Sequence, residues 1–154
     1  MRVSRSIEVR RPLLDVYRFL VVPENHLRFA PGLLEFRQTS PGAPWQVGGT
    51  ALGSRRLLGR NVKEPVTFIE NDGSSRLAFS GSVGPFPAVG RFVLSPTPGG
   101  TIIQVTAESR GRGIGRLAEP VLYLAGRRNL RQLAFRLKEI LEAPDPEVTP
   151  AAGH

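Results

Sequence analysis

The side chains that could take part in acid–base or metal chemistry are few in this 154-residue sequence. Cysteine is absent, and the two histidines are His26 and the last residue, His154. Disulfides are therefore excluded, two histidines do not supply the ligands of a zinc site, and no serine is placed for a catalytic triad. We predict neither a metal nor a cofactor. We interpret His26 as a surface or capping residue, with a pocket acid or base as the alternative.

Four side chains are candidates for a general acid or base: His26, Arg91, Glu108 and Tyr123. Such a group must come within about 3 Å of the reacting atoms, so these residues matter for catalysis only if two of them converge in a cavity. Arg91 lies within a predicted strand and needs an acidic partner or an anionic ligand if it points inward. We expect Glu64, in another strand, to be solvated or ion-paired. The sequence assigns no catalytic residue.

Basic residues are concentrated between Arg110 and Lys138. The formal net charge of the chain is +8, and this stretch contains a single acid, Glu119. A patch of this kind attracts nucleic acid, anionic lipid or an acidic protein, although an arginine-rich composition could also produce a merely solvated face. Nucleic acid is the less favoured partner because few aromatic side chains accompany the arginines. The candidate anion- or membrane-binding residues are Arg112, Arg116, Arg127, Arg128 and Arg131.

A two-residue alternation and a helical repeat predict the strands and helices that position these residues. Residues 46–108 contain one alternating run after another, separated by glycine, proline and asparagine turns, and residues 114–142 predict one long helix. Short helices are expected over 12–22 and 23–29. Strands that are separated from helices indicate an α+β fold with an antiparallel sheet, here curved around the long helix. The predicted strands cover residues 4–9, 33–39, 49–58, 61–71, 76–81, 88–95 and 101–108.

The long helix has two apolar sides. One carries Leu117, Val121 and Leu124, and the other carries Leu122, Gly126, Leu130, Leu133, Leu137 and Ile140. The second side is more continuous and is predicted to face the sheet, whereas the first would face a cavity, a covering loop or a second subunit. An oligomer is therefore one possible arrangement. The candidates for the lining of a ligand cavity are Phe29, Arg91, Glu108, Leu117, Val121, Tyr123 and Leu124.

Four stretches, in this order, carry a resemblance to a known family: Ser6–Leu20, Pro23–Leu33, Pro98–Thr101 and Leu133–Glu142. Together they resemble the START-like superfamily (SRPBCC), the polyketide cyclase/dehydrase and lipid-transport proteins. The resemblance implies a helix-grip (Bet v 1-like) fold, in which about seven antiparallel strands and two short N-terminal helices surround one long C-terminal helix. It also implies a hydrophobic cavity between the sheet and that helix.

We expect a single START-like domain over residues 1–142 and, because residues 143–154 are rich in proline and poor in apolar residues, a disordered tail. The resemblance implies binding or transport of a small hydrophobic ligand such as a lipid, a quinone or a polyketide-like compound. The alternatives are a polyketide cyclase or dehydratase, and RNA or protein binding through the basic helix. No apolar run is long enough to span a membrane and the N-terminus lacks a signal-peptide core, so we expect a cytoplasmic protein.

Overall fold

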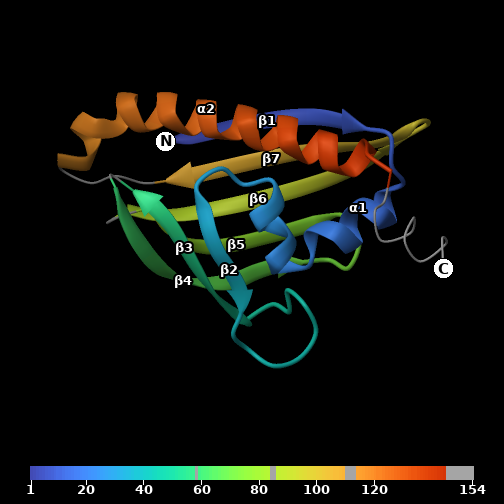
Figure 1. The fold of residues 1–154 in the computed structure, drawn as a ribbon, viewed down its shortest axis with the longest axis horizontal. Helices are drawn as coiled ribbons and strands as arrows, with labels where there is room; N and C mark the ends of the chain where they lie inside the picture. Colours follow the sequence, from blue (N-terminus) through green and yellow to red (C-terminus); the bar gives the residue numbers. More distant parts are fainter. Residues whose placement is uncertain (58, 84–85, 110–113, 145–154) are drawn as a thin grey trace.

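Seven strands form one antiparallel sheet in the computed structural model, which describes residues 1–57, 59–83, 86–109 and 114–144. The strands are β1 (Arg2–Val9), β2 (Leu33–Gln38), β3 (Thr50–Leu57), β4 (Arg60–Asn71), β5 (Arg76–Val83), β6 (Phe86–Thr97) and β7 (Gly100–Ser109). Their order across the sheet is β1-β7-β6-β5-β4-β3-β2 (Figure 1). The predicted α+β class is confirmed, and each predicted strand is present with its ends within two residues of the prediction.

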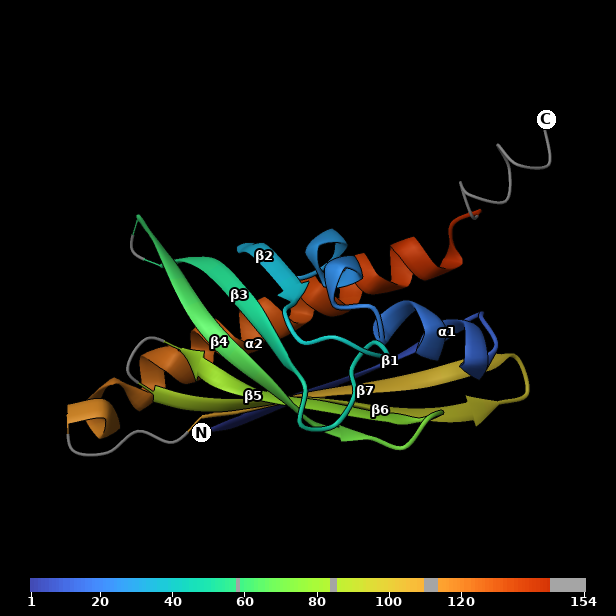
Figure 2. The same cartoon turned by 90° about the horizontal axis from the view of Figure 1, so that it is seen from below.

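The helices lie on the concave face of this sheet (Figure 2). They are α1 (Leu13–Leu20), the 3-10 helix η1 (Pro23–Arg28) and the long helix α2 (Ile114–Glu142). The bounds of α2 agree with the sequence prediction, whereas the second short helix is a 3-10 helix opened by a proline. Among the described helices, none combines the length and the apolar character that crossing a bilayer requires.

The sheet is bent at its β2–β4 side by two irregularities, one in β2 after Leu33 and one in β4 between Phe68 and Glu70. β4 contains a proline, Pro65, a residue that sheets confine largely to edge strands and bulges. β4 is not an edge strand, however, since it lies between β3 and β5. Pairing of the described residues of β4 with β5 begins only at Thr67, however, so the N–H that Pro65 lacks is not needed by that ladder.

The predicted sheet-facing side of α2 is confirmed by its burial. Leu130, Leu133 and Leu137 are buried in the core. A Cβ atom at Gly126 would lie 3.4 Å from a methyl group of Val3, so this glycine permits close approach of the helix to β1. Close contact between α2 and β1 therefore sets which side of the helix faces inward.

The loop between β2 and β3 is anchored in the core by Trp45. Its side chain is fully buried, stacks on Phe68 at a ring distance of 4.6 Å and donates from Nε1 to the carbonyl oxygen of Ala78 at 3.2 Å. Trp45 has a φ of 59°, a conformation uncommon for a non-glycine residue. This loop therefore contributes to the aromatic core under the β2–β4 side of the sheet.

Candidate ligand-binding site

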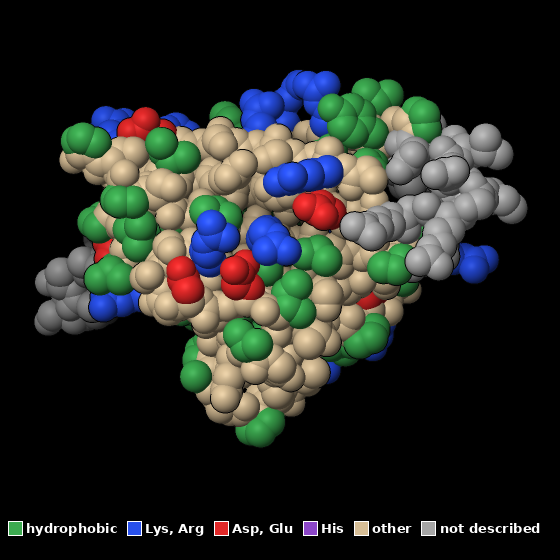
Figure 3. Space-filling model, turned by 180° about the vertical axis from the view of Figure 1, so that it is seen from behind, with side chains coloured by type: hydrophobic (Ala, Val, Ile, Leu, Met, Phe, Trp, Pro, Cys, Tyr) green, Lys and Arg blue, Asp and Glu red, His purple; other side chains and the backbone are tan. Residues whose placement is uncertain are grey.

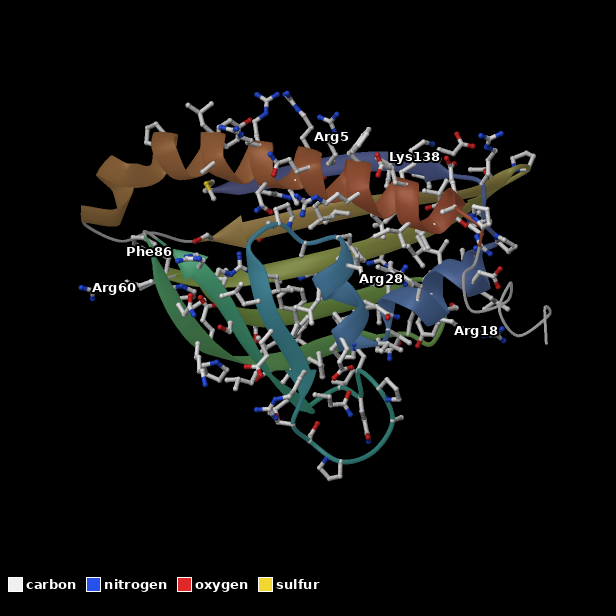
Figure 4. The ribbon with its side chains drawn as sticks, in the orientation of Figure 1. Arg5, Arg18, Arg28, Arg60, Phe86 and Lys138 are labelled. Carbon is white, nitrogen blue, oxygen red and sulfur yellow. The ribbon has the colours of Figure 1, made fainter. Side chains whose placement is uncertain are left out.

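A cavity of about 350 Å³ lies between the sheet and α2. Its walls come from β1 to β7, from the segment that links η1 to β2, and from one side of α2. The lining extends from His26 in η1 to Phe86, at the end of the sheet farthest from α1 (Figure 4). This volume falls at the lower end of the range of small-molecule sites, roughly 300–1,000 Å³.

The cavity exists because the wall formed by the sheet carries very small residues on neighbouring strands. These are Gly53, Gly81, Ala88, Gly90 and Ala107. A Cβ atom at Gly90 would lie only 2.6 Å from the ring of Phe79, so packing requires glycine there. At Gly81 the nearest atom is a methyl of Val66 at 3.6 Å, an ordinary contact. The missing side chain at Gly81 therefore leaves space that the core does not fill.

Aromatic side chains close the end of the cavity beside η1, with the imidazole of His26 at their centre. Its ring centroid lies 4.9 Å from that of Phe29, 5.2 Å from Phe36 and 5.4 Å from both Trp45 and Phe92. His26, Phe29, Phe36 and Phe92 all line the cavity and are all buried. A ligand that reaches this end therefore meets flat apolar rings and one imidazole.

The expectation that His26 lies at the surface is wrong, since the residue is only 3% exposed. The missed signal is a period of three: Pro23, His26 and Phe29 are all buried, as expected for one side of a helix with three residues per turn. Burial lowers the pKa of His26 to about 4, so the imidazole is neutral at pH 7. Its Nε2 lies 2.8 Å from the carbonyl oxygen of Leu20.

A second ionisable group, Glu64, lines the cavity from β4. Along this strand Glu64, Val66 and Phe68 are buried while the residues between them are exposed, so alternation turns Glu64 inward. The carboxyl group is therefore buried rather than solvated. The alternation of Glu64, Val66 and Phe68 is present in the sequence, but the prediction that Glu64 is solvated or ion-paired used only its charge and not this pattern.

Arg91 and Glu108, the two candidates from the strands, border the cavity, but their charged groups form ion pairs with Glu70 and Arg2. Arg91 donates to Glu70 at 3.1 Å, and its side chain is 39% exposed. Glu108 forms an ion pair with Arg2 at 3.5 Å. The outer face of the sheet shows such acidic and basic side chains side by side (Figure 3). The four candidate acid–base groups therefore do not converge inside the cavity.

The candidates from α2 require a correction. Leu124 is 65% exposed and Tyr123 is also exposed, and neither lines the cavity. The cavity lies instead along the sheet-facing side of the helix, whose lining residues are Ala125, Gly126, Asn129, Leu130 and Leu133. Leu124, the described residue of the first side, faces solvent, while the second, more continuous side faces both the sheet and the cavity. The side chains of Leu117 and Val121 lie outside the described residues.

The arginines of the proposed anion patch are exposed wherever they are described. Arg127, Arg128 and Arg131 lie on the outer side of α2. The guanidinium of Arg127 sits 5.8 Å from the ring centroid of Tyr123. Arg112 and the side chain of Arg116 lie outside the described residues. The structure thus brings three of the five predicted arginines together on one helix surface.

Comparison with known proteins agrees with this architecture. The family model described as "Polyketide cyclase / dehydrase and lipid transport" matches residues 1–142. The chain belongs to this family. The START-like resemblance and the helix-grip fold are thereby confirmed over almost the whole sequence. A search of curated proteins finds no match.

Solved structures share the family fold at low sequence identity. TTHA0849 from Thermus thermophilus is 18% identical with a TM-score of 0.74, over 90% of this chain and 95% of that one. Ara h 8.0201 is 12% identical with a TM-score of 0.70, over 92% and 97%. The di-domain ARO/CYC BexL from the BE-7585A biosynthetic pathway is 17% identical with a TM-score of 0.69, over 94% of this chain and 50% of BexL. At these identities the likeness shows the fold alone.

Proposed function

We propose that this protein binds a small hydrophobic molecule in the cavity between the sheet and α2. The observation that carries the proposal is the cavity itself, about 350 Å³ in volume and lined mainly by glycine, aliphatic and aromatic residues. Sites for small molecules combine such apolar walls with a few placed polar groups, here His26 and Glu64. The family description, which includes lipid transport, is compatible with this use.

For the four acid–base candidates predicted from the sequence, the geometry supports binding more than catalysis. A cyclase or dehydratase needs a general acid or base close to the substrate, in a protonation state matched to its task. Arg91 and Glu108 form ion pairs outside the cavity, and Tyr123 lies on the far side of α2. His26 faces the cavity, but its low pKa makes it a poor proton carrier near pH 7.

Native mass spectrometry of the freshly purified protein, followed by organic extraction, tests the proposal. We expect a bound apolar compound or, for a protein purified empty, saturable binding of 2-methoxynaphthalene monitored by fluorescence. A protein that carries no ligand and does not bind this probe would contradict a cavity function. Turnover of a polyketide-like compound without stable binding would favour the enzymatic alternative instead.

The outer side of α2 supports an additional proposal, docking on an anionic membrane. Leu124, Arg128, Arg131 and Phe135 follow one another at spacings of four, three and four residues and so share a stripe. Leu124 and Phe135 are 65% and 63% exposed. Among the described residues, no carboxylate lies within ion-pair distance of these two arginines. Because the inner side of α2 lines the cavity, docking would bring the membrane next to the cavity wall.

Reversing two charges of this stripe is expected to release the protein from vesicles. Each basic residue near an anionic surface contributes about 1 kcal/mol, so Arg128→Glu with Arg131→Glu should weaken sedimentation with phosphatidylserine vesicles at least about tenfold. The matched control is Arg18→Glu with Arg28→Glu, since both arginines are exposed and lie on α1 and η1 (Figure 4). Membrane docking would be contradicted if vesicle binding did not weaken with added salt, if both double variants bound vesicles equally well, or if the protein bound RNA but not vesicles.

A further inference from the structure

We propose that His26 is the recognition residue at the aromatic end of the cavity and selects flat-ring ligands that carry a hydrogen-bond donor, a hydroxylated aromatic compound being the simplest. The inference rests on the proposed function, because it needs a ligand in the cavity. It specifies the chemical class of that ligand and the residue that recognises it.

The hydrogen bond of His26 fixes which of its nitrogens can accept a donor. A carbonyl oxygen only accepts, so the 2.8 Å contact between Nε2 and the carbonyl of Leu20 places the proton on Nε2. In a neutral ring the other nitrogen, Nδ1, then carries a lone pair. Among the described residues, none donates a hydrogen bond to Nδ1. His26 therefore brings an acceptor to the cavity wall with its other nitrogen already occupied.

The ring is also held in one place before a ligand arrives. Four aromatic rings surround it at centroid distances of 4.9 to 5.4 Å. The carbonyl oxygen of His26 accepts from the backbone N–H groups of Phe29 at 3.3 Å and Ala30 at 2.9 Å, which fixes the backbone of the residue. A polar group whose position is fixed in advance loses little entropy when it binds a ligand.

The chemistry of this end favours a donor on a flat ring. An acceptor that no protein group occupies can take a hydrogen bond from a ligand hydroxyl. Aromatic faces, such as those of Phe29 and Phe92, pack best against another ring. An anionic headgroup is disfavoured here because a neutral imidazole whose Nε2–H is already bonded to Leu20 offers it neither a charge nor a free donor. Burial holds the pKa of His26 at about 4, which keeps this character at neutral pH.

Paired probes and two variants test the assignment. Fluorescence titrations compare 2-naphthol with 2-methoxynaphthalene, which lacks the hydroxyl donor, on the full-length protein, on His26→Phe and on the matched control His154→Phe. One neutral hydrogen bond corresponds to roughly a 2- to 12-fold preference. We expect the preference for 2-naphthol to fall by that factor in His26→Phe and to persist in His154→Phe, the same change at the other histidine.

Each other outcome is decisive. A preference that survives His26→Phe, or that is lost equally in His154→Phe, overturns the role of His26 while the proposed function stands. If the full-length protein binds neither probe, the proposed function and this inference both fail. If the full-length protein prefers 2-naphthol over 2-methoxynaphthalene no more than His26→Phe does, only the inference fails.

Nitrogen-15 spectra of the histidine side chains in the full-length protein give a second readout, in which the His26→Phe variant serves only to assign the signals. The chain has two histidines, so the His26→Phe spectrum identifies the signals of His154 by what remains. We expect the Nδ1 resonance of His26 to have the position of an unprotonated nitrogen and to shift on addition of 2-naphthol but not of 2-methoxynaphthalene. An equal response to both probes, or to neither, would contradict a hydrogen bond to Nδ1.

Discussion

Leucine in place of Gly81 is expected to abolish binding of small apolar ligands while the protein remains folded. Gly81 lies on β5 and lines the cavity. A Cβ atom there would meet a methyl of Val66 at 3.6 Å and the carbonyl oxygen of Pro65 at 3.7 Å, both ordinary contacts. The rest of a leucine side chain must then extend into the cavity of about 350 Å³. The variant therefore occupies the space that a ligand would take.

The stability of Gly81→Leu is expected to be unchanged or higher. Glycine weakens a strand interior, and burying a leucine side chain stabilises a protein by about 1.5–3 kcal/mol. Thermal unfolding measures the stability, and titration with 2-methoxynaphthalene measures the affinity, which should fall at least about tenfold. Gly90 is unsuitable for the same experiment, because its Cβ atom would lie 2.6 Å from the ring of Phe79 and the fold would suffer.

A matched control is Gly99→Leu, the same change in the turn between β6 and β7. A Cβ atom at Gly99 meets nothing within 4 Å, and the residue does not line the cavity. Binding by this variant should equal that of the unmodified protein. If Gly81→Leu is folded and binds 2-methoxynaphthalene at full strength, the ligand site is elsewhere on the molecule.

The elements of the fold are predictable because their signals are local. Alternation within short segments locates the strands, and the absence of breakers over most of residues 114–142 locates α2. The loop that carries Trp45 gives no such signal. Its positive φ and its contact with Phe68 depend on the finished sheet, so the sequence predicts only a turn there.

The cavity wall was harder to predict for a related reason. The more continuous apolar side of α2, which carries Leu130, was predicted to face the sheet, but hydrophobicity alone does not say that the cavity lies on this same side rather than beside Leu124. The close approach of Gly126 to Val3 decides the rotation of α2, and that contact joins residues 123 positions apart in the chain. Similarly, Gly81 and Gly90 become one surface only when β5 pairs with β6. Long-range pairing, rather than local pattern, makes the site.

Acidification from pH 7 to pH 5 is expected to destabilise the protein by about 2 kcal/mol through His26 alone. Burial lowers its pKa from 6.5 in the unfolded chain to about 4 in the folded protein. Between these values the unfolded state binds a proton that the folded state excludes, so the free energy of unfolding falls as the pH falls. Each pH unit inside this window contributes about 1.4 kcal/mol.

Urea unfolding at pH 7, 6 and 5 measures this slope, and His26→Phe is the comparison. The variant leaves the carbonyl of Leu20 without its donor and should be less stable at every pH, but its stability should change less between pH 7 and 5. Hydrogen bonds lower the pKa of Asp72 and Glu142, so these two carboxylates titrate below the window. Equal slopes in the two proteins would place His26 in solvent.

Because the pKa of His26 in the folded protein is about 4, stability and ligand preference should respond to pH in different ranges. Protonation of Nδ1 in the folded protein would remove the acceptor proposed for the ligand, but it requires a pH near 4. The preference for 2-naphthol over 2-methoxynaphthalene should therefore persist at pH 5, where the fold is already weakened. Loss of the preference in parallel with stability, between pH 6.5 and 5, would mean that His26 becomes charged in the folded state and that its burial does not exclude the proton.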